Sequence, residues 1–219
     1  RTEQNRTEQN RTEQNRTECI ILSNNSFILP ELRETVGRNS FCVRQLVPED
    51  GCDEEIYKMT QKIGRSENKF NNEPFGMTRE EFASWCKKQD AWSRGEMLPE
   101  NYVKQWTFWI YVNNIPVGYG RLRERVTEQS KIFGGNIGSA VANDFRGRGY
   151  GTFLIKSLIN YACKLNIDYV LSTVEKYNYA SKIACEKAGG VLVDENSERW
   201  FFRFDEVMKT IKEKNNNNA

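Results

Sequence analysis

The sequence predicts an α/β domain built on one mixed sheet, and three observations lead to that prediction. Residues 102–112 carry apolar side chains on both faces of a strand, which is typical of a central strand. After a turn of two asparagines, residues 117–126 return as its hairpin partner. Farther along, a strand over 136–141, a helix over 151–165 and a strand over 168–174 form a right-handed crossover unit, which pairs its two strands in parallel.

The segment before the central strand supplies one strand and two helices. Residues 41–47 alternate as a first strand, and residues 53–63 carry apolar side chains at helical spacing. A loop rich in Asn, Pro and Gly follows. Thr78 and Glu81 then form a capping box, which predicts a second helix over residues 78–90.

The segment after the crossover unit completes the sheet. Asn178 is a typical N-cap for a helix over 178–188, and two glycines end that helix. Two further strands are predicted over 191–194 and 199–204. The total is about seven strands, mostly antiparallel with one parallel pair, and about four helices.

The chain divides into four parts. Residues 1–18 repeat the pentapeptide Arg-Thr-Glu-Gln-Asn, have almost nothing apolar to bury, and are expected to be disordered. Residues 19–40 are predicted to be an irregular lead-in, and residues 41–204 are predicted to be the folded domain. Residues 205–219 form a tail with a frayed helix at most.

Composition excludes several classes of function. The 219 residues contain 32 basic and 30 acidic side chains, so the chain has no broad field that would recruit nucleic acid or an anionic membrane. Histidine is absent and the six cysteines lack ligand spacing, so we expect neither a metal site nor a histidine-dependent triad. Without an 18-residue apolar run or a secretion signal, we expect a reducing cytoplasm with free thiols.

A glycine-rich stretch between the strand at 136–141 and the following helix predicts a phosphate site. Glycine lets backbone N–H groups approach an anion, and the helix presents unpaired N–H groups and its positive dipole end to the same place. The alternative is a loop that is rich in glycine only because it turns sharply. The residues expected to hold phosphate are Arg146, Gly147, Arg148, Gly149, Tyr150, Gly151 and Thr152.

Two common phosphate motifs do not fit this stretch. A dinucleotide fold requires GxGxxG and an acidic residue at the end of the next strand, whereas this loop reads GxGxG and the next strand ends at Val174. A P-loop requires lysine before its Ser or Thr, and here Gly151 directly precedes Thr152.

The spacing of Arg146, Gly149 and Gly151, with a helix directly after, resembles the acyl-CoA pyrophosphate loop of the GNAT superfamily of N-acetyltransferases. The resemblance extends less closely over residues 41–204, and residues 77–190 are similar to bacterial GNAT proteins whose substrates are not obvious. It implies that the parallel pair splays apart, so that the strand before the loop can pair with pantetheine and polarise the thioester. On this resemblance the further cofactor-binding residues are Ser139, Ala140, Val141, Asn178 and Ser181.

The resemblance leaves the proton carriers open. Many GNAT proteins have a Tyr seven residues after the helix-capping Asn, but here that position is Cys185, which is either the acid or a small buried helix residue. Tyr177 and Tyr179 are nearby substitutes. A general base without histidine requires either a chain of water molecules or a carboxylate whose pKa is raised by burial. Glu124 and Glu175 are the candidate carboxylates, although each can also be an ordinary surface charge.

Two groups of side chains have both a structural and a functional interpretation. Four aromatic residues in the first half either line an acceptor pocket or fill the core between helices and sheet. They are Phe75, Phe82, Trp85 and Trp92. Arg121 and Arg123 on the return strand of the hairpin are expected to be solvated or paired.

The resemblance therefore implies an acyltransferase of GNAT type that moves an acetyl group from acetyl-CoA, its co-substrate, to an amine in a ternary complex, and we expect it in the cytoplasm. The acceptor is expected to be a small molecule or a peptide, with no nucleic acid or membrane partner, and the sequence leaves both a monomer and a homodimer open. The alternative is a non-catalytic acetyl-CoA sensor of the same fold. Cys185 replaces the usual tyrosine, and the loop could still bind acetyl-CoA without that tyrosine.

Overall fold

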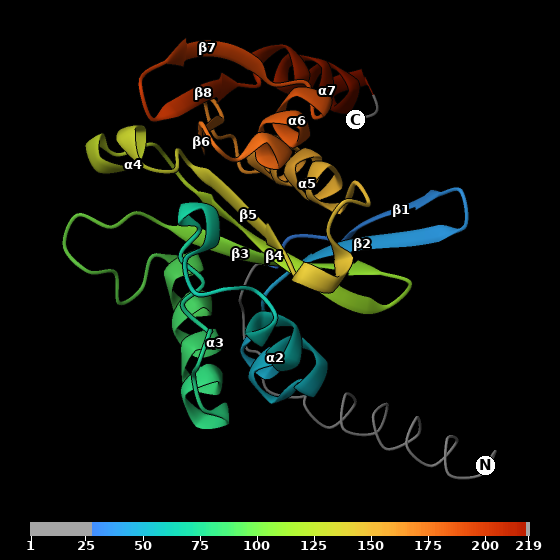
Figure 1. Ribbon diagram of the computed structural model, residues 1–219, viewed down its shortest axis with the longest axis vertical. Coiled ribbons are helices and arrows are strands. Elements are labelled where there is room, and N and C mark those ends of the chain that lie inside the picture. The colour runs from blue at the N-terminus through green and yellow to red at the C-terminus, as the bar shows by residue number, and fades with distance from the viewer. Residues whose placement is uncertain (1–27, 218–219) are drawn as a thin grey trace.

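The computed structural model describes residues 28–217, which form eight strands and six α-helices (Figure 1). The strands are β1 (Leu32–Val36), β2 (Asn39–Gln45), β3 (Gln105–Val112), β4 (Ile115–Arg123), β5 (Ile137–Val141), β6 (Leu171–Glu175), β7 (Val191–Glu195) and β8 (Arg199–Arg203). The helices are α2 (Glu54–Gln61), α3 (Arg79–Arg94), α4 (Glu128–Ile132), α5 (Tyr150–Lys164), α6 (Tyr179–Lys187) and α7 (Asp205–Asn217). Short 3-10 turns are η2 (Pro48–Cys52), η3 (Glu67–Lys69) and η4 (Asn143–Phe145).

The strands form two sheets. One has five strands in the order β1-β2-β3-β4-β5, and the other has three in the order β6-β8-β7. Every strand pair among residues 28–217 is antiparallel. Helices α2 and α3 cover one face of the larger sheet, whereas α5 covers the other face, together with α6, α7 and the smaller sheet (Figure 1).

The two faces of the larger sheet explain why β3 is apolar on both sides. Phe108 and Ile110 face α5, where the ring of Phe108 stacks on Tyr161 at 4.3 Å between centroids. Trp109 and Tyr111 face α2 and α3 instead. The prediction of a central strand is confirmed, because β3 pairs with β2 on one edge and β4 on the other.

The predicted parallel pair is not formed. Within the described chain, β5 pairs only with β4, and β6 only with β8, so the single mixed sheet is corrected to two antiparallel sheets. The sheets meet at Asn136, whose backbone N–H donates to the Leu171 carbonyl at 3.0 Å. Its side-chain Oδ1 accepts from the Leu171 N–H at 2.7 Å, and its Nδ2 donates to the Tyr169 carbonyl at 3.0 Å.

Gly135 makes this junction tight. A Cβ on this residue, whose φ is +64°, would lie 2.0 Å from the Leu171 carbonyl oxygen. The side chain of Asn136 thus forms hydrogen bonds that a neighbouring strand would otherwise form. Beyond this residue β5 and β6 form no ladder with each other. Sequence patterns predict strands and their order, but they do not predict that one buried amide replaces a row of backbone hydrogen bonds.

Four further elements differ from the sequence prediction, and one of them is α4, which lies in a segment where no helix was predicted. Strand β1 lies inside the expected irregular lead-in and pairs with β2 across a turn at Gly37. Helix α3 continues to Arg94 because Gly95, with a φ of 82°, is the residue that ends it. The expected frayed tail is the 13-residue helix α7, and its Met208 is buried. The predicted repeat tail, residues 1–18, lies outside the described residues.

Candidate active site

The glycine-rich loop joins the edge strand β5 to helix α5. After Val141 the chain makes the 3-10 turn η4, and Phe145 and Arg146 donate their backbone N–H groups back to Ala142 and Asn143. Gly147 and Gly149 then adopt φ values of 75° and 83°. This left-handed backbone strains residues with a side chain, which explains why glycine occupies both positions.

The mouth of helix α5 is open. A Cβ built on Gly147, Gly149 or Gly151 meets no atom of residues 28–217 within 4 Å. Gly149 is the N-cap and has no side chain to accept from the first turn, and the first intrahelical bond runs from Phe153 N–H to the Gly149 carbonyl at 3.2 Å. The N–H groups of residues 150–152 therefore have no partner in the helix and can hold an anion.

Tyr150 contributes only its backbone to this mouth. Its ring is 8% exposed and packs edge-on against Phe41 at 5.7 Å between centroids. The side chain therefore anchors the first turn of α5 to strand β2. Among the predicted loop residues, Tyr150 is the one whose side chain belongs to the core.

Both predicted arginines lie on the exposed loop and brace it. Arg146 Nε donates to the Val141 carbonyl at 2.9 Å. Arg148 Nη2 donates to the Asp144 carbonyl at 3.1 Å and its guanidinium lies 5.8 Å from the centroid of Phe145. Both guanidinium groups belong to the loop that leads into the positive end of α5, where a diphosphate would form charge-assisted hydrogen bonds.

The loop is also tied to the opposite side of the sheet. Lys62, the C-cap residue of α2, forms an ion pair with Asp144 at 2.7 Å. The Lys62 carbonyl also accepts from the Asn143 N–H at 3.5 Å. Both side chains of the ion pair are more than half exposed, so it adds little to stability and mainly fixes where the loop lies.

Strand β5 has one open edge. Ala142 N–H donates to the Val117 carbonyl, and Arg123 N–H donates to the Asn136 carbonyl, which fixes the alternation of bonds between β4 and β5. Because hydrogen-bonded and non-bonded pairs alternate in an antiparallel ladder, Ile137, Ser139 and Val141 direct their backbone groups away from β4.

The three predicted β5 residues therefore differ. Ser139 presents both its N–H and its carbonyl at the open edge, whereas Ala140 bonds toward β4. Val141 also faces the open edge, but its carbonyl already accepts from Arg146. The carbonyl of Ala140 would lie 2.3 Å from a Cβ on Gly118, so a glycine is required on the paired strand.

Asn178 and Ser181 lie at the start of α6. Asn178 Oδ1 accepts from the Ser181 N–H at 3.1 Å and so caps the helix, as the sequence predicts. Tyr179 is 64% exposed, and its ring lies edge-on to Trp200 at 5.5 Å. Tyr177 is similarly exposed.

Cys185 lies in the core. It is fully buried, and its Sγ contacts Ser172 Oγ at 3.6 Å. Burial raises the pKa of the thiol to about 11, so it stays protonated at neutral pH. Of the two interpretations, the structure favours a packing role for Cys185. Its thiol has no contact with solvent, which a proton donor would require. Because the folded pKa is the higher one, this group's contribution to stability is present below the unfolded pKa and is lost as pH rises through about 11.

We expect native-state alkylation to distinguish Cys185 from an exposed thiol. Cys52 is exposed, whereas Cys185 has no accessible surface. Brief treatment of the folded protein with iodoacetamide, followed by peptide mass mapping, should label Cys52 and leave Cys185 unmodified. Labelling of Cys185 as fast as Cys52 would place its thiol at the surface and would support its role as a proton donor.

The two predicted carboxylates have different surroundings. Glu175 is buried and forms an ion pair with Arg199, which also donates to Thr173 Oγ1 at 3.2 Å. Glu124 is exposed and directly follows β4, near the residue that pairs with Asn136. The carboxylate of Glu175 is thus neutralised by its partner, and that of Glu124 is accessible.

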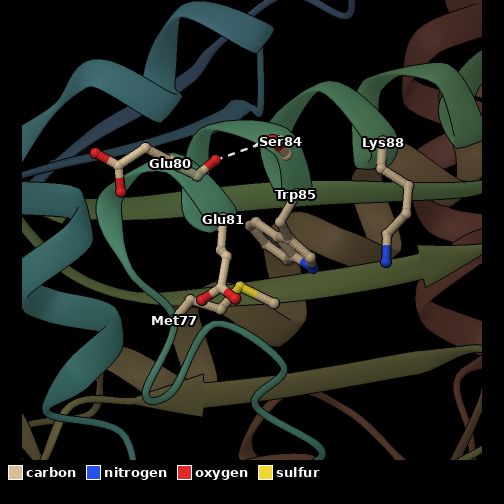
Figure 2. Close-up of a pocket in the computed structure, with 6 residues that line it drawn as sticks. All are labelled: Met77, Glu80, Glu81, Ser84, Trp85 and Lys88. Atoms are coloured by element: carbon tan, nitrogen blue, oxygen red, sulfur yellow. Dashed lines mark hydrogen bonds between the residues drawn. The ribbon is translucent and has the colours of Figure 1, made fainter.

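The aromatic residues of the first half are mainly core. Phe82, Trp85 and Trp92 are at most 7% exposed, and Phe75 is half-buried under Arg65. Trp85 also lines a shallow depression of about 360 Å³ on α3 (Figure 2). Its lining residues are Met77, Glu80, Glu81, Ser84, Trp85 and Lys88.

Arg121 is paired, which is one of the two states that the sequence predicts, but it is buried rather than solvated. It is 5% exposed, and its Nη2 lies 3.5 Å from Glu73 Oε1 and donates to the Tyr119 hydroxyl at 3.3 Å. Its Nε has no hydrogen-bond partner among the described residues. The signal in the sequence was a pair of arginines two residues apart in a strand whose other positions are core, so that both point to one face.

Other classes of site have no support in the described chain. No group of three His, Cys, Asp or Glu side chains among residues 28–217 could hold a metal ion. In the same residues no helix is both long and apolar enough to cross a bilayer.

Comparison with known proteins identifies the class of protein. The family profile described as "Acetyltransferase (GNAT) domain" matches residues 41–191, and the chain belongs to this family. No curated protein sequence gives a match.

Solved structures share the fold at low sequence identity. The ribosomal-protein-S5-alanine acetyltransferase from Vibrio fischeri is 13% identical with a TM-score of 0.58, covering 78% of this chain and 95% of that one. RimL, a ribosomal L7/L12 alpha-N-protein acetyltransferase in complex with coenzyme A, is 12% identical with a TM-score of 0.56, covering 81% and 97%. The microcin C7 self-immunity acetyltransferase MccE, in complex with acetyl-CoA and AMP, is 15% identical with a TM-score of 0.55, covering 74% and 91%.

Proposed function

We propose that this protein transfers an acetyl group from acetyl-CoA to an amine, directly and within a ternary complex. The observation that carries the proposal is the open edge of β5 leading straight into the unobstructed N-terminus of α5. The end of α5 can bind an anion, and the adjoining strand β5 has free backbone groups. Together they suit a long ligand with a diphosphate at one end and amide groups along its arm. Coenzyme A has this form, and the fold relatives RimL and MccE were crystallised with CoA and acetyl-CoA.

The diphosphate is proposed to lie at the mouth of α5. The N–H groups of residues 147–152 would donate to its oxygens, and the helix dipole favours its negative charge. Arg146 and Arg148 would add charge from the loop. Asn178 and Ser181 are proposed to border the cofactor at the head of α6.

The pantetheine arm is proposed to extend from the loop along β5 toward Ile137, pairing with the open edge as an added strand. The N–H of Ser139 then becomes a donor for the thioester carbonyl. A preorganised backbone donor of this kind stabilises the tetrahedral oxyanion by about 3 kcal/mol in comparable enzymes.

The transfer itself has a simple balance. The acceptor ammonium loses one proton and its nitrogen attacks the thioester carbon, so that a C–N bond forms and the C–S bond breaks. The nitrogen loses a second proton, and the departing thiolate takes up one proton to give CoA thiol. One proton is released overall.

The accessible side chains are the proposed proton carriers. Glu124, exposed beside the Asn136 end of β5, is the proposed base, and Tyr179, exposed at the head of α6, is the proposed acid. Cys185 and Glu175 are less suitable, because one is buried in the core and the other is occupied by Arg199.

A thiol-release assay tests the proposal. Acetyl-CoA is incubated with panels of amino acids, polyamines, drug-like amines and peptide N-termini, and free CoA is measured. The wild type should release thiol with at least one amine, and the double variant Arg146→Ala/Gly149→Val should lose at least about 100-fold in kcat/KM for acetyl-CoA, because a charged partner and the amide cradle are both removed.

The same assay separates the enzyme from the sensor. Tight binding of acetyl-CoA without thiol release on any amine would support the non-catalytic sensor. Equal activity of the wild type and the double variant would contradict the site itself.

A further inference from the structure

A cluster of basic side chains lies on the α3 face of the sheet, at the end of β5 remote from the glycine loop. Arg121 and Arg123 are two residues apart on β4, so both project to the same face. Their partners across the ladder are Gly138 and Asn136, which lie at the start of β5. The distance from Asn136 to the loop at Ala142 is about 20 Å, because an extended strand rises about 3.4 Å per residue.

Neither arginine has a full set of partners. Arg121 is almost completely buried between the rings of Phe70 and Tyr119, and its Nε is without a hydrogen bond in the described part of the chain. Arg123 is half-buried and donates from Nη1 to the Gly135 carbonyl at 3.2 Å. It forms no ion pair with a carboxylate of residues 28–217.

Positive charge exceeds negative charge in this cluster. The carboxylate that meets it is Glu73, which lies 3.5 Å from Arg121 and 3.7 Å from Lys88. One carboxylate therefore faces three cations, counting Arg123. Burial and the neighbouring charge of Arg121 lower the pKa of Arg123 to about 10, which is the expected result of confining two guanidinium groups together.

The cluster is adjacent to the proposed position of the thioester. The ring of Phe70 covers Gly138, with its Cε2 3.4 Å from the place of a Cβ, and Gly138 precedes Ser139. Trp85 Nε1 donates to Glu73 at 3.0 Å, and Trp85 and Lys88 also line the depression on α3 (Figure 2). The depression and the cluster are therefore joined by contacts, because Trp85 and Lys88 meet Glu73, and Glu73 meets Arg121.

We infer that the acceptor amine carries an oxyanion, a carboxylate or a phosphate, which Arg121 and Arg123 bind while Glu73 faces its ammonium group. This inference rests on the proposed acetyltransferase function and names the substrate class of that site. A buried guanidinium with an unused donor beside a half-buried one suits a planar or tetrahedral oxyanion, because two N–H groups can bind it together. The phosphates of the cofactor do not fill this cluster, since their proposed site is at the other end of β5.

Matched pairs of acceptors test the inference. Glycine is compared with glycinamide, and phosphoethanolamine with ethanolamine, in the thiol-release assay. We expect kcat/KM for one anionic amine to exceed that of its neutral partner by at least about tenfold, the loss typical of one charge-assisted contact. The pair that shows the preference distinguishes a carboxylate site from a phosphate site.

Variants then assign the preference to the cluster. Arg123→Gln keeps an N–H donor for the Gly135 carbonyl but removes the charge, so it should raise KM for the anionic amine and bring the ratio within each pair close to one. Arg123→Lys should retain most of the preference. Arg125→Gln, an exposed arginine two residues farther on, is the matched control and should leave the ratio unchanged.

The outcomes separate the two proposals. If no amine of either pair or of the wider panel releases thiol with the wild type, the acetyltransferase proposal fails and this inference falls with it. If amines react but neutral partners are used as well as anionic ones, the inference is wrong and the acetyltransferase proposal stands. The inference is also wrong if Arg123→Gln lowers both members of a pair equally, because a structural defect acts on both.

Discussion

Replacing Gly149 with valine is expected to weaken acetyl-CoA binding about 100-fold, which corresponds to about 2.7 kcal/mol. A β-branched residue does not tolerate the φ of 83°, so the backbone must rotate and carry the N–H groups of the first turn of α5 away from the diphosphate. Its methyl groups would also occupy the open space beside the glycine. Titration calorimetry with acetyl-CoA measures the effect.

Gly37→Val is the matched control for this substitution. Gly37 has a φ of 62° and lies in the turn between β1 and β2, and a Cβ there meets no described atom within 4 Å. It should lose a similar amount of stability, about 1 kcal/mol, with no loss of acetyl-CoA affinity. Equal binding by the Gly149 and Gly37 variants would mean that the diphosphate is held elsewhere.

Replacing Asn136 with leucine is expected to lower the free energy of unfolding by about 3 kcal/mol or more, because buried backbone groups lose their partners. Asn136 has no exposed surface, and its side chain satisfies the Leu171 N–H and the Tyr169 carbonyl where the two sheets meet. Leucine has a similar volume but cannot form either bond. Urea denaturation followed by tryptophan fluorescence measures the change.

Asn196→Leu provides the comparison for Asn136. Its Oδ1 also accepts from two backbone N–H groups, those of Glu198 and Arg199, but the residue is exposed in the β7–β8 turn. Water can replace these bonds, so the expected loss is about 1 kcal/mol or less. A similar small loss for Asn136→Leu would show that its side chain does not hold the sheets together.

The sequence predicted the local elements well because each depends on residues close together in the chain. The capping box at Thr78, the alternation along β3 and the Asn178 cap all appear where their patterns placed them. Gly147 and Gly149 likewise predicted a left-handed backbone, which residues with a side chain rarely adopt.

Long-range features were not predicted, for identifiable reasons. The separation of β5 from β6 depends on Asn136 bonding to residues 33 and 35 positions later, and no periodicity marks such a contact. The burial of Arg121 depends on Phe70 and Glu73, which lie in a loop whose sequence has no periodicity. Cys185 shows the limit of position alone, because its place after Asn178 allowed either a proton donor or a buried helix residue, and only its surroundings place it in the core.

The central claim is that a diphosphate binds at the mouth of α5 while the thioester arm lies along β5. Backbone amide NMR during titration with acetyl-CoA tests it most directly, with pantetheine, which lacks the diphosphate, as the comparison. We expect acetyl-CoA to shift the amide signals of Gly149, Gly151 and Ser139 while the Gly37 signal stays in place, and pantetheine to have little effect on the two loop glycines. Saturation with acetyl-CoA that leaves the signals of Gly149, Gly151 and Ser139 unmoved would contradict the account.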